Sequence, residues 1–139
     1  MNGTAPRKQE GVMMLEVLIG ILIFSIGILA MLGMQAISMQ ATIDAKYRSE
    51  ASFLANEIIG VMWVDRASIM DYDTTSGAGT PQLAVWIARV QQVLPNATGA
   101  NAPTIALSGR QATVTVRWMR PGEATPHRHE TVAQINEPL

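Results

Sequence analysis

Two histidines are the first candidates for chemistry in this sequence, because imidazole is a common ligand of transition metals. His127 and His129 lie two positions apart and are followed by Glu130. On a β-strand both imidazoles would face the same side. A transition-metal site needs a further ligand at suitable spacing, and the sequence offers none. We therefore expect no metal site at these residues.

Three aspartates form a second candidate site, in this case for calcium. Asp65, Asp71 and Asp73 lie beside a run of Thr, Ser and Gly that predicts a loop. The ligand spacing of an EF-hand is absent, so we expect an ordinary solvated loop. The sequence has no cysteine, and no catalytic triad, phosphate loop or pair of catalytic carboxylates stands out. We expect neither an enzyme nor a bound cofactor.

Four arginines in the C-terminal part are a third candidate, for a basic surface: Arg110, Arg117, Arg120 and Arg128. The net charge of -1 and the pI near 6.1 do not indicate a nucleic-acid-binding protein. We expect these arginines to lie on a solvated strand face, and we do not expect nucleic acid as a partner.

Glu16 is the most informative acid, because it stands alone at the head of an apolar run. No charged residue follows it until Asp44, and the segment Val17–Met34 is long enough to span a bilayer. A helix that is apolar on every face needs more protein around it than 139 residues supply. We therefore predict a membrane helix. Arg7 and Lys8 precede it, which favours an N-in, C-out orientation.

The apolar run differs from a cleaved secretory signal, since no A-x-A-like site follows it. We expect it to stay in the mature protein. Its acid then needs an explanation, because an unpaired charge near a membrane helix costs about a few kcal/mol. The helix macrodipole stabilises an anion in the first turns. That effect explains why an acid can stand at position 16, but it does not explain why the apolar run contains no other acid.

Gly11, the hydrophobic Val12, Glu16 four positions later and the long apolar helix together resemble the class III signal of type IV pilins and pseudopilins. The resemblance implies that prepilin peptidase cuts between Gly11 and Val12 and that Val12 is then N-methylated. The family most often carries Phe at this place, where this chain has Val12. The resemblance also implies that Glu16 pairs with the free amine of a neighbouring subunit. Such a pair would set the register between helices in an apolar filament core.

Within the family of type IV pilins, the segment SIGILAMLGMQ resembles one group in particular, the minor pilins called type IV pilus modification protein PilV. Major pilins usually carry a helix-loosening Pro where Gly33 stands. A glycine costs about 1 kcal/mol relative to alanine inside a helix. We therefore expect Gly27 and Gly33 to loosen the helix or to admit a neighbouring helix, and Gly33 to mark where it melts in a filament. The stretches YRSEASFLANEI, VLPNATGAN and TVTVRW resemble the same group.

The chain beyond the apolar run predicts one long helix and a second, shorter one. Apolar residues recur at steps of three and four from Ile43 to Met62, and no proline interrupts the run from about Ala36 to Ile69. We expect the first helix to end around Ile69 to Tyr72. A second helix is expected from about Gln82 to Leu94, because Pro81 suits a first helical turn.

Three strands are expected after the second helix, at Thr104–Leu107, Ala112–Met119 and Arg128–Ile135. The middle one alternates apolar and polar residues, as a half-buried strand does. Two turn signals join them: Ser108-Gly109-Arg110 and Pro121-Gly122-Glu123. We predict an antiparallel sheet with one face packed on the amphipathic half of the long helix.

These features predict an α+β fold of type IV pilin-like form, in which the apolar half of the long helix protrudes and the amphipathic half packs on a small C-terminal antiparallel β-sheet. Residues 1–11 would be a cytoplasmic leader that is removed. Residues 12–40 would be the transmembrane and assembly helix, and residues 41–139 a periplasmic globular domain that includes the second half of the helix.

The resemblance implies a minor pilin that supports assembly and initiation of a type IV pilus. It would span the inner membrane once before assembly and lie in the filament afterwards. The implied partners are other minor and major pilins, prepilin peptidase, the pilus assembly platform and the inner membrane. Three alternatives stay open: a minor pseudopilin of type II secretion, a membrane-anchored enzyme or binding module, and a minor pilin that receives DNA.

Overall fold

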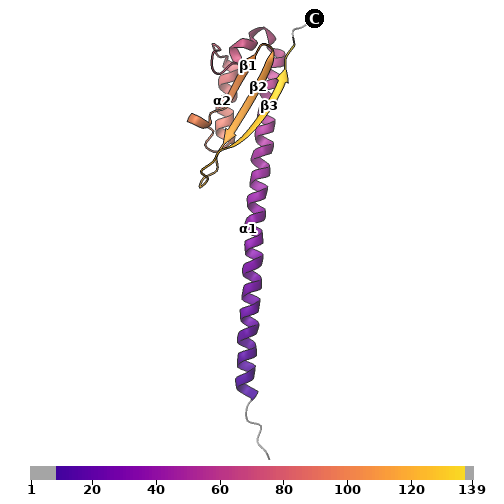
Figure 1. Ribbon diagram of the computed structural model, residues 1–139, viewed down its shortest axis with the longest axis vertical. Coiled ribbons are helices and arrows are strands. Elements are labelled where there is room, and N and C mark those ends of the chain that lie inside the picture. Colours follow the sequence, from indigo (N-terminus) through magenta and orange to yellow (C-terminus); the bar gives the residue numbers. More distant parts are fainter. Residues whose placement is uncertain (1–8, 137–139) are drawn as a thin grey trace, which may run out of the picture. The chain divides into compact units, whose positions relative to one another are not determined.

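The structure is a computed structural model that describes residues 9–136. The predicted leader residues 1–8, with Arg7 and Lys8, lie outside the described residues. The elements in chain order are the helices α1 (Gln9–Val64), η1 (Arg66–Tyr72), α2 (Pro81–Val93) and η2 (Gly99–Asn101) and the strands β1 (Thr104–Ser108), β2 (Gln111–Trp118) and β3 (His127–Gln134). A long apolar N-terminal helix followed by a small antiparallel sheet confirms the α+β layout (Figure 1).

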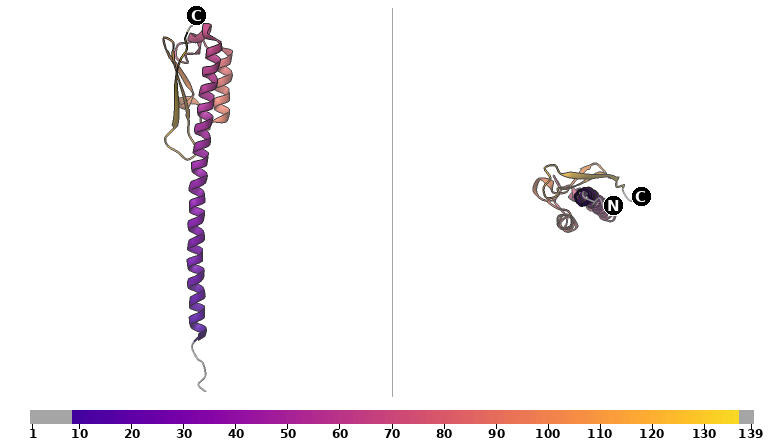
Figure 2. Two further views of the ribbon diagram at one scale, coloured as in Figure 1. Left: turned by 90° about the vertical axis from the view of Figure 1, so that its right-hand side faces the viewer. Right: turned by 90° about the horizontal axis from the view of Figure 1, so that it is seen from below.

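The chain divides into two compact units, Met1–Ile43 and Asp44–Leu139. In the first unit the described residues form one uninterrupted stretch of α1. In the second unit, residues 44–64 of α1 lie between the sheet and α2 (Figure 2). The helix segment therefore buries apolar side chains against the sheet on one side and against α2 on the other. The core lies at the contacts between these three layers.

The core of the second unit combines the stripe predicted on the long helix with the apolar faces of α2 and the sheet. Its largest fully buried side chains are Trp118, Tyr72, Leu54, Ile58, Met62, Leu94, Ile105, Ile135, Val90, Val114 and Val116. On β2 the buried residues Ala112, Val114, Val116 and Trp118 alternate as predicted. The polar Thr115 is also buried on the other face.

The sheet has the order β1-β2-β3 with both pairs antiparallel, which confirms the predicted meander. Ser108 pairs with Gln111, and Trp118 pairs with His127. Gly109 and Gly122 occupy the connecting turns with φ of 59° and 87°. A side chain is strained in that left-handed region, so glycine is required for these two reversals.

The prediction that the first helix continues to Ile69–Tyr72 was wrong. α1 ends at Val64, and Asp65 has the non-helical angles φ -101° and ψ 51°. The chain then forms the 3-10 helix η1, which turns Ile69 and Tyr72 into the core. The Tyr72 hydroxyl donates to a carboxylate oxygen of Asp65 at 3.0 Å. Folding back buries these two side chains, and this gain outweighs the continued helix.

The second helix begins one residue earlier than predicted and ends one residue earlier. The hydroxyl of Thr80 accepts a hydrogen bond from the Leu83 amide at 3.0 Å, and Pro81 occupies the first turn. This N-cap satisfies an amide that the helix leaves unpaired. The buried face of α2 contains Leu83, Trp86 and Val90, as its spacing predicts.

Candidate functional site

The first candidate site is the apolar part of α1, where no described residue covers the side chains. From Val12 to Met39 the large apolar side chains are between 42% and 74% exposed. The most apolar window of the helix is 0% buried, and the helix is long and apolar enough to cross a membrane. Leaving this much apolar surface in water is unfavourable, so this surface is a candidate for contact with lipid or with other protein chains.

Two hydroxyl groups in the uncharged part of α1 are satisfied by the helix itself. The Ser25 hydroxyl donates to the Ile21 carbonyl at 2.7 Å, and the Thr42 hydroxyl donates to the Ser38 carbonyl at 2.9 Å. Because these hydroxyls bond four residues back, they need no water. At these two positions the helix is therefore compatible with an apolar surrounding.

Glu16 is the only charged side chain within this surface, and Gly11, Val12 and Glu16 all lie in α1. Residues four apart share a helix face, so Val12 and Glu16 are neighbours. They line a shallow depression of about 310 Å³ together with Leu15 and Ile19. Among residues 11–136 no hydrogen bond or ion pair engages the Glu16 carboxylate. The carboxylate is available to a cation from outside the described chain.

Gly27 and Gly33 lie inside an unbroken stretch of α1. A Cβ built at either position would meet no atom within 4 Å. Close approach of another helix and local melting in a filament both concern an assembled state, so these two roles stay predictions.

The two histidines do face the same side of β3, but each is engaged separately. His127 Nε2 lies 2.9 Å from a Glu123 carboxylate oxygen, and His129 Nε2 lies 2.9 Å from the Thr131 hydroxyl. The part of the chain that the structure describes holds no cluster of three or more potential metal ligands. The Trp118 ring stacks on His127, with centroids 5.6 Å apart. Both imidazoles therefore act as packing and hydrogen-bonding groups of the sheet.

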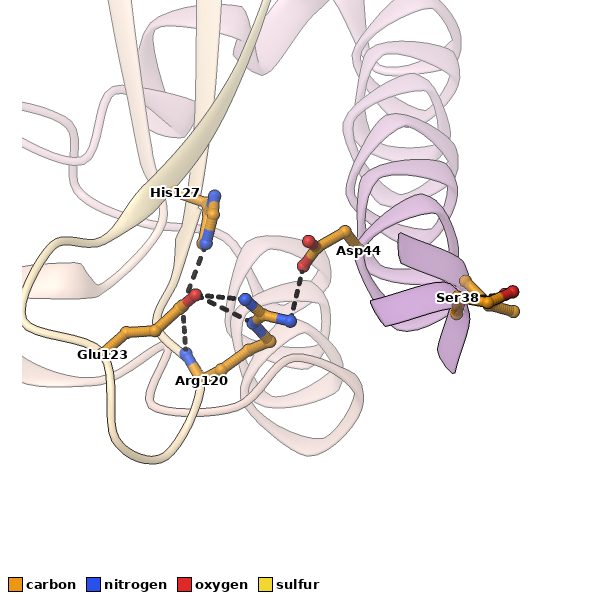
Figure 3. Close-up of polar contacts among 6 residues, drawn as sticks. Ser38, Asp44, Arg120, Glu123 and His127 are labelled. Carbon is orange, nitrogen blue, oxygen red and sulfur yellow. Dashed lines mark hydrogen bonds and ion pairs between the residues drawn. The ribbon is translucent and has the colours of Figure 1, made fainter. Parts of the chain in front are cut away.

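Four charged or polar side chains form a cluster that sequence reasoning missed, and we call it the polar clamp: Asp44, Arg120, Glu123 and His127 (Figure 3). The Arg120 guanidinium pairs with Glu123 and lies 2.9 Å from Asp44. The expectation that Arg120 lies on a solvated strand face was wrong, because its side chain is only 21% exposed. The clamp fastens the β2–β3 turn to the start of the second unit.

Hydrogen bonding shifts the proton equilibria of the polar clamp. The Arg120 guanidinium, assisted by His127, lowers the pKa of Glu123 from 4.5 to about 2. The Glu123 carboxylate in turn raises the pKa of Arg120. Arg120 and Glu123 flank the turn signal Pro121-Gly122, and a turn brings such flanking residues close together. This is the one local sign of the polar clamp in the sequence. The contact with Asp44 has no local signal.

The low pKa of Glu123 predicts a specific loss of stability in acid. Its contribution is present above pH 4.5, where the carboxylate is charged in both folded and unfolded chains, and it is lost as the pH falls towards about 2. We expect Glu123→Gln to lower the Tm of the full chain in detergent at neutral pH and to flatten the fall of Tm between these two values. Glu130→Gln is the control, since that carboxylate lies 3.8 Å from Arg128 and is 41% exposed. Identical pH profiles for Glu123→Gln and the unmodified chain would contradict this role.

Asp73 corrects the expectation of a solvated loop, because it is only 9% exposed. One carboxylate oxygen accepts the amides of Thr75 at 2.7 Å and Ser76 at 3.0 Å, and the other accepts the Leu107 amide at 3.1 Å. These bonds to the charged form lower the pKa of Asp73. An aspartate in a turn bonds the backbone that follows it, so this residue anchors the loop rather than binding calcium.

A groove of about 330 Å³ lies between residues 57–61 of α1 and the start of α2. Its lining is mainly apolar, and its charged members Glu57 and Arg89 form an ion pair with each other. The lining contains no serine, threonine, cysteine or histidine, and its one carboxylate, Glu57, is engaged by Arg89.

Comparison of the chain with protein-family models, with curated proteins and with solved structures finds no match.

Proposed function

We propose that this chain is a minor pilin of a type IV pilus, similar to the PilV group, which enters the filament through its N-terminal helix. The observation that carries the proposal is the uncovered apolar surface of α1 with one unpaired carboxylate, Glu16, at its start. Gly11 and Val12 precede that carboxylate at the spacing of the pilin signal.

The same surface supports two successive surroundings for the helix. Before assembly the subunit spans the inner membrane once, with its N-terminus in the cytoplasm, and lipid covers the side chains from Val17 to Ile43. A bilayer core needs about 20 apolar residues, and this uncharged segment is long enough. After assembly, the apolar helices of other minor and major pilins replace the lipid. The driving force for this exchange is small for apolar side chains, so a polar contact is needed to direct it.

Glu16 supplies that polar contact. Cleavage by prepilin peptidase behind Gly11 creates an amine on Val12, which the pilus assembly platform brings beside the carboxylate of a neighbouring subunit. Opposite charges attract strongly where water is excluded, and the pair also removes two isolated charges from an apolar core. Because each helix carries only one such carboxylate, the pair can form at only a few axial offsets between neighbouring helices. The resulting subunit is a structural component and not an enzyme.

The processing step provides the direct test of this proposal. We expect mass spectrometry of the mature protein to show a chain that begins at Val12 and carries one added methyl group, but only in cells that contain the peptidase. Gly11→Ala should leave the precursor uncut, whereas Gly20→Ala should be processed normally. Both substitutions are sterically free, because a Cβ at either glycine meets no atom within 4 Å. A Met1 terminus on the unmodified chain in the presence of peptidase would overturn the pilin assignment.

The machine that takes up the subunit is identified by purification rather than by processing, because pseudopilins of type II secretion use the same signal. We expect the chain to co-purify with pilus components. Co-purification with secretion components alone would replace the pilus by a pseudopilus.

A further inference from the structure

The sheet has two outer edges, and the edge formed by β1 is closed. The Thr74 amide donates to the Ile105 carbonyl at 2.9 Å, and the Ile105 amide donates to the Thr74 hydroxyl at 3.1 Å. The Leu107 amide donates to Asp73 at 3.1 Å. The outward-facing amides of β1 are therefore occupied from within the chain, and no further strand has access to them.

The register of the sheet shows which groups face outward at the other edge. Ile105 lies opposite Val114, and Val114 lies opposite Thr131. Because Ile105 directs its N–H and C=O away from β2, Val114 directs its own groups toward β3, where Thr131 meets them. The alternate residues of β3 then point their backbone groups away from the sheet. These residues are Arg128, Glu130, Val132 and Gln134.

The edge formed by these four residues, which we call the β3 edge, is open. Among the hydrogen bonds of residues 9–136, none reaches the backbone groups of the β3 edge. Eight consecutive residue pairs join β3 to β2 without a bulge, and no proline lies within the strand. Bulges and prolines are two of the means by which proteins block an edge strand, and β3 has neither. The β3 edge therefore presents a regular row of donors and acceptors.

The side chains of the β3 edge give it a charge pattern. All four are exposed on the outer face, and Val132 is 50% exposed. Arg128 and Glu130 are 67% and 41% exposed, and their mutual contact of 3.8 Å is long. Two charges of opposite sign at alternate positions discourage indiscriminate pairing and favour a strand of complementary charge.

We propose that the β3 edge binds an extended segment of another protein chain, which adds antiparallel to β3 with an acidic residue opposite Arg128 and a basic residue opposite Glu130. Main-chain hydrogen bonds supply the affinity, and the two charge pairs supply the selectivity. A second copy of β3 fits less well. When two copies of β3 pair antiparallel, Arg128 of each copy lies opposite Glu130 of the other only if the strands overlap over a short length. A register with a longer overlap places Glu130 opposite Val132 instead. This proposal does not rest on the assignment as a pilin.

The test uses the full chain in detergent micelles and two synthetic eight-residue peptides of alternating pattern. In the first peptide valine, lysine and glutamate lie opposite Val132, Glu130 and Arg128 in the antiparallel register. In the second peptide the lysine and the glutamate are exchanged. We expect the first peptide to bind about fivefold more tightly, as two cross-strand charge pairs predict. We also expect it to slow amide exchange at Arg128, Glu130, Val132 and Gln134.

Two variants separate strand addition from ordinary charge attraction. The double substitution Arg128→Glu with Glu130→Arg should reverse the preference between the peptides. Val132→Pro removes one outward amide without breaking the ladder to β2, a position where edge strands tolerate proline. It should weaken both peptides about tenfold, through the lost hydrogen bond and the bulk of the ring.

Three results would overturn the proposal. Equal binding of the two peptides would remove the charge selectivity. If the Val132→Pro variant binds both peptides as tightly as the unmodified chain, while its β2 amides stay protected from exchange, then the peptides do not pair with the backbone of the β3 edge. Protection of the β3 edge that rises with protein concentration in the absence of peptide would assign this edge to a second copy of the chain.

Discussion

Glu16→Ala is expected to leave peptidase processing and membrane insertion intact while blocking incorporation into filaments. In the proposed filament, the substitution would leave the amine of a neighbouring Val12 buried without its partner. Removing one member of a buried ion pair costs about 3–5 kcal/mol, which corresponds to a loss of incorporation of more than about a hundredfold. The measurement is the amount of the subunit in sheared filaments relative to the membrane fraction.

Glu16→Gln is the matched variant, because it keeps the size and the hydrogen-bonding oxygen of the side chain but not its charge. We expect it to incorporate as poorly as Glu16→Ala if the charge is what matters. Correct processing of both variants, seen by mass spectrometry, shows that the defect lies in assembly. Wild-type amounts of Glu16→Ala in filaments would remove the assembly role of this carboxylate.

Trp86→Ala is expected to cause a large loss of stability in the second unit. Trp86 is 4% exposed, packs in the core and donates from its indole nitrogen to the Leu54 carbonyl at 2.8 Å. Truncating a buried tryptophan costs about 3–5 kcal/mol. That amount is a large part of the total for a small domain, which is about 5–15 kcal/mol. Urea unfolding of the full chain in detergent, followed by exchange of the β2 amides, measures the change.

Val85→Ala on the same helix is the control for this prediction. Val85 is 70% exposed, so its truncation removes little buried surface. We expect its free energy of unfolding to change by less than about 0.5 kcal/mol. Similar losses for Trp86→Ala and Val85→Ala would mean that α2 is held by contacts other than its buried face.

The sequence predicted the elements whose signals are local. Steps of three and four gave the buried face of α2, and strict alternation gave the inner face of β2 at Val114 and Val116. Gly109 and Gly122 located the two reversals of the sheet, and both have a positive φ there. Each of these signals lies within one helical turn, one strand or one hairpin, so neighbouring residues suffice to read it.

The candidate assembly surface was also predictable, since it depends on composition and spacing. The run without charge after Glu16 predicts an apolar helix that begins with this carboxylate. The spacing of four residues places Val12 and Glu16 on the same face of that helix. The structure adds that the described chain leaves these side chains uncovered and satisfies the hydroxyls of Ser25 and Thr42 within the helix. The roles of Gly11, Val12, Glu16, Gly27 and Gly33 stay predictions, because they concern a peptidase or an assembled filament.

The order of α1, α2 and the three strands, and the apolar helix with its single acid, could therefore be read from the sequence, whereas the 3-10 helices η1 and η2 could not. The end of α1 at Val64, the burial of Asp73, the polar clamp and the difference between the two sheet edges became visible only in the folded chain. The physical reason is that these features depend on partners far apart in the chain. Asp44 meets Arg120, and Asp73 meets Leu107, only after the helix and the sheet have packed together. No local pattern records which distant group will satisfy a carboxylate or leave a strand edge open.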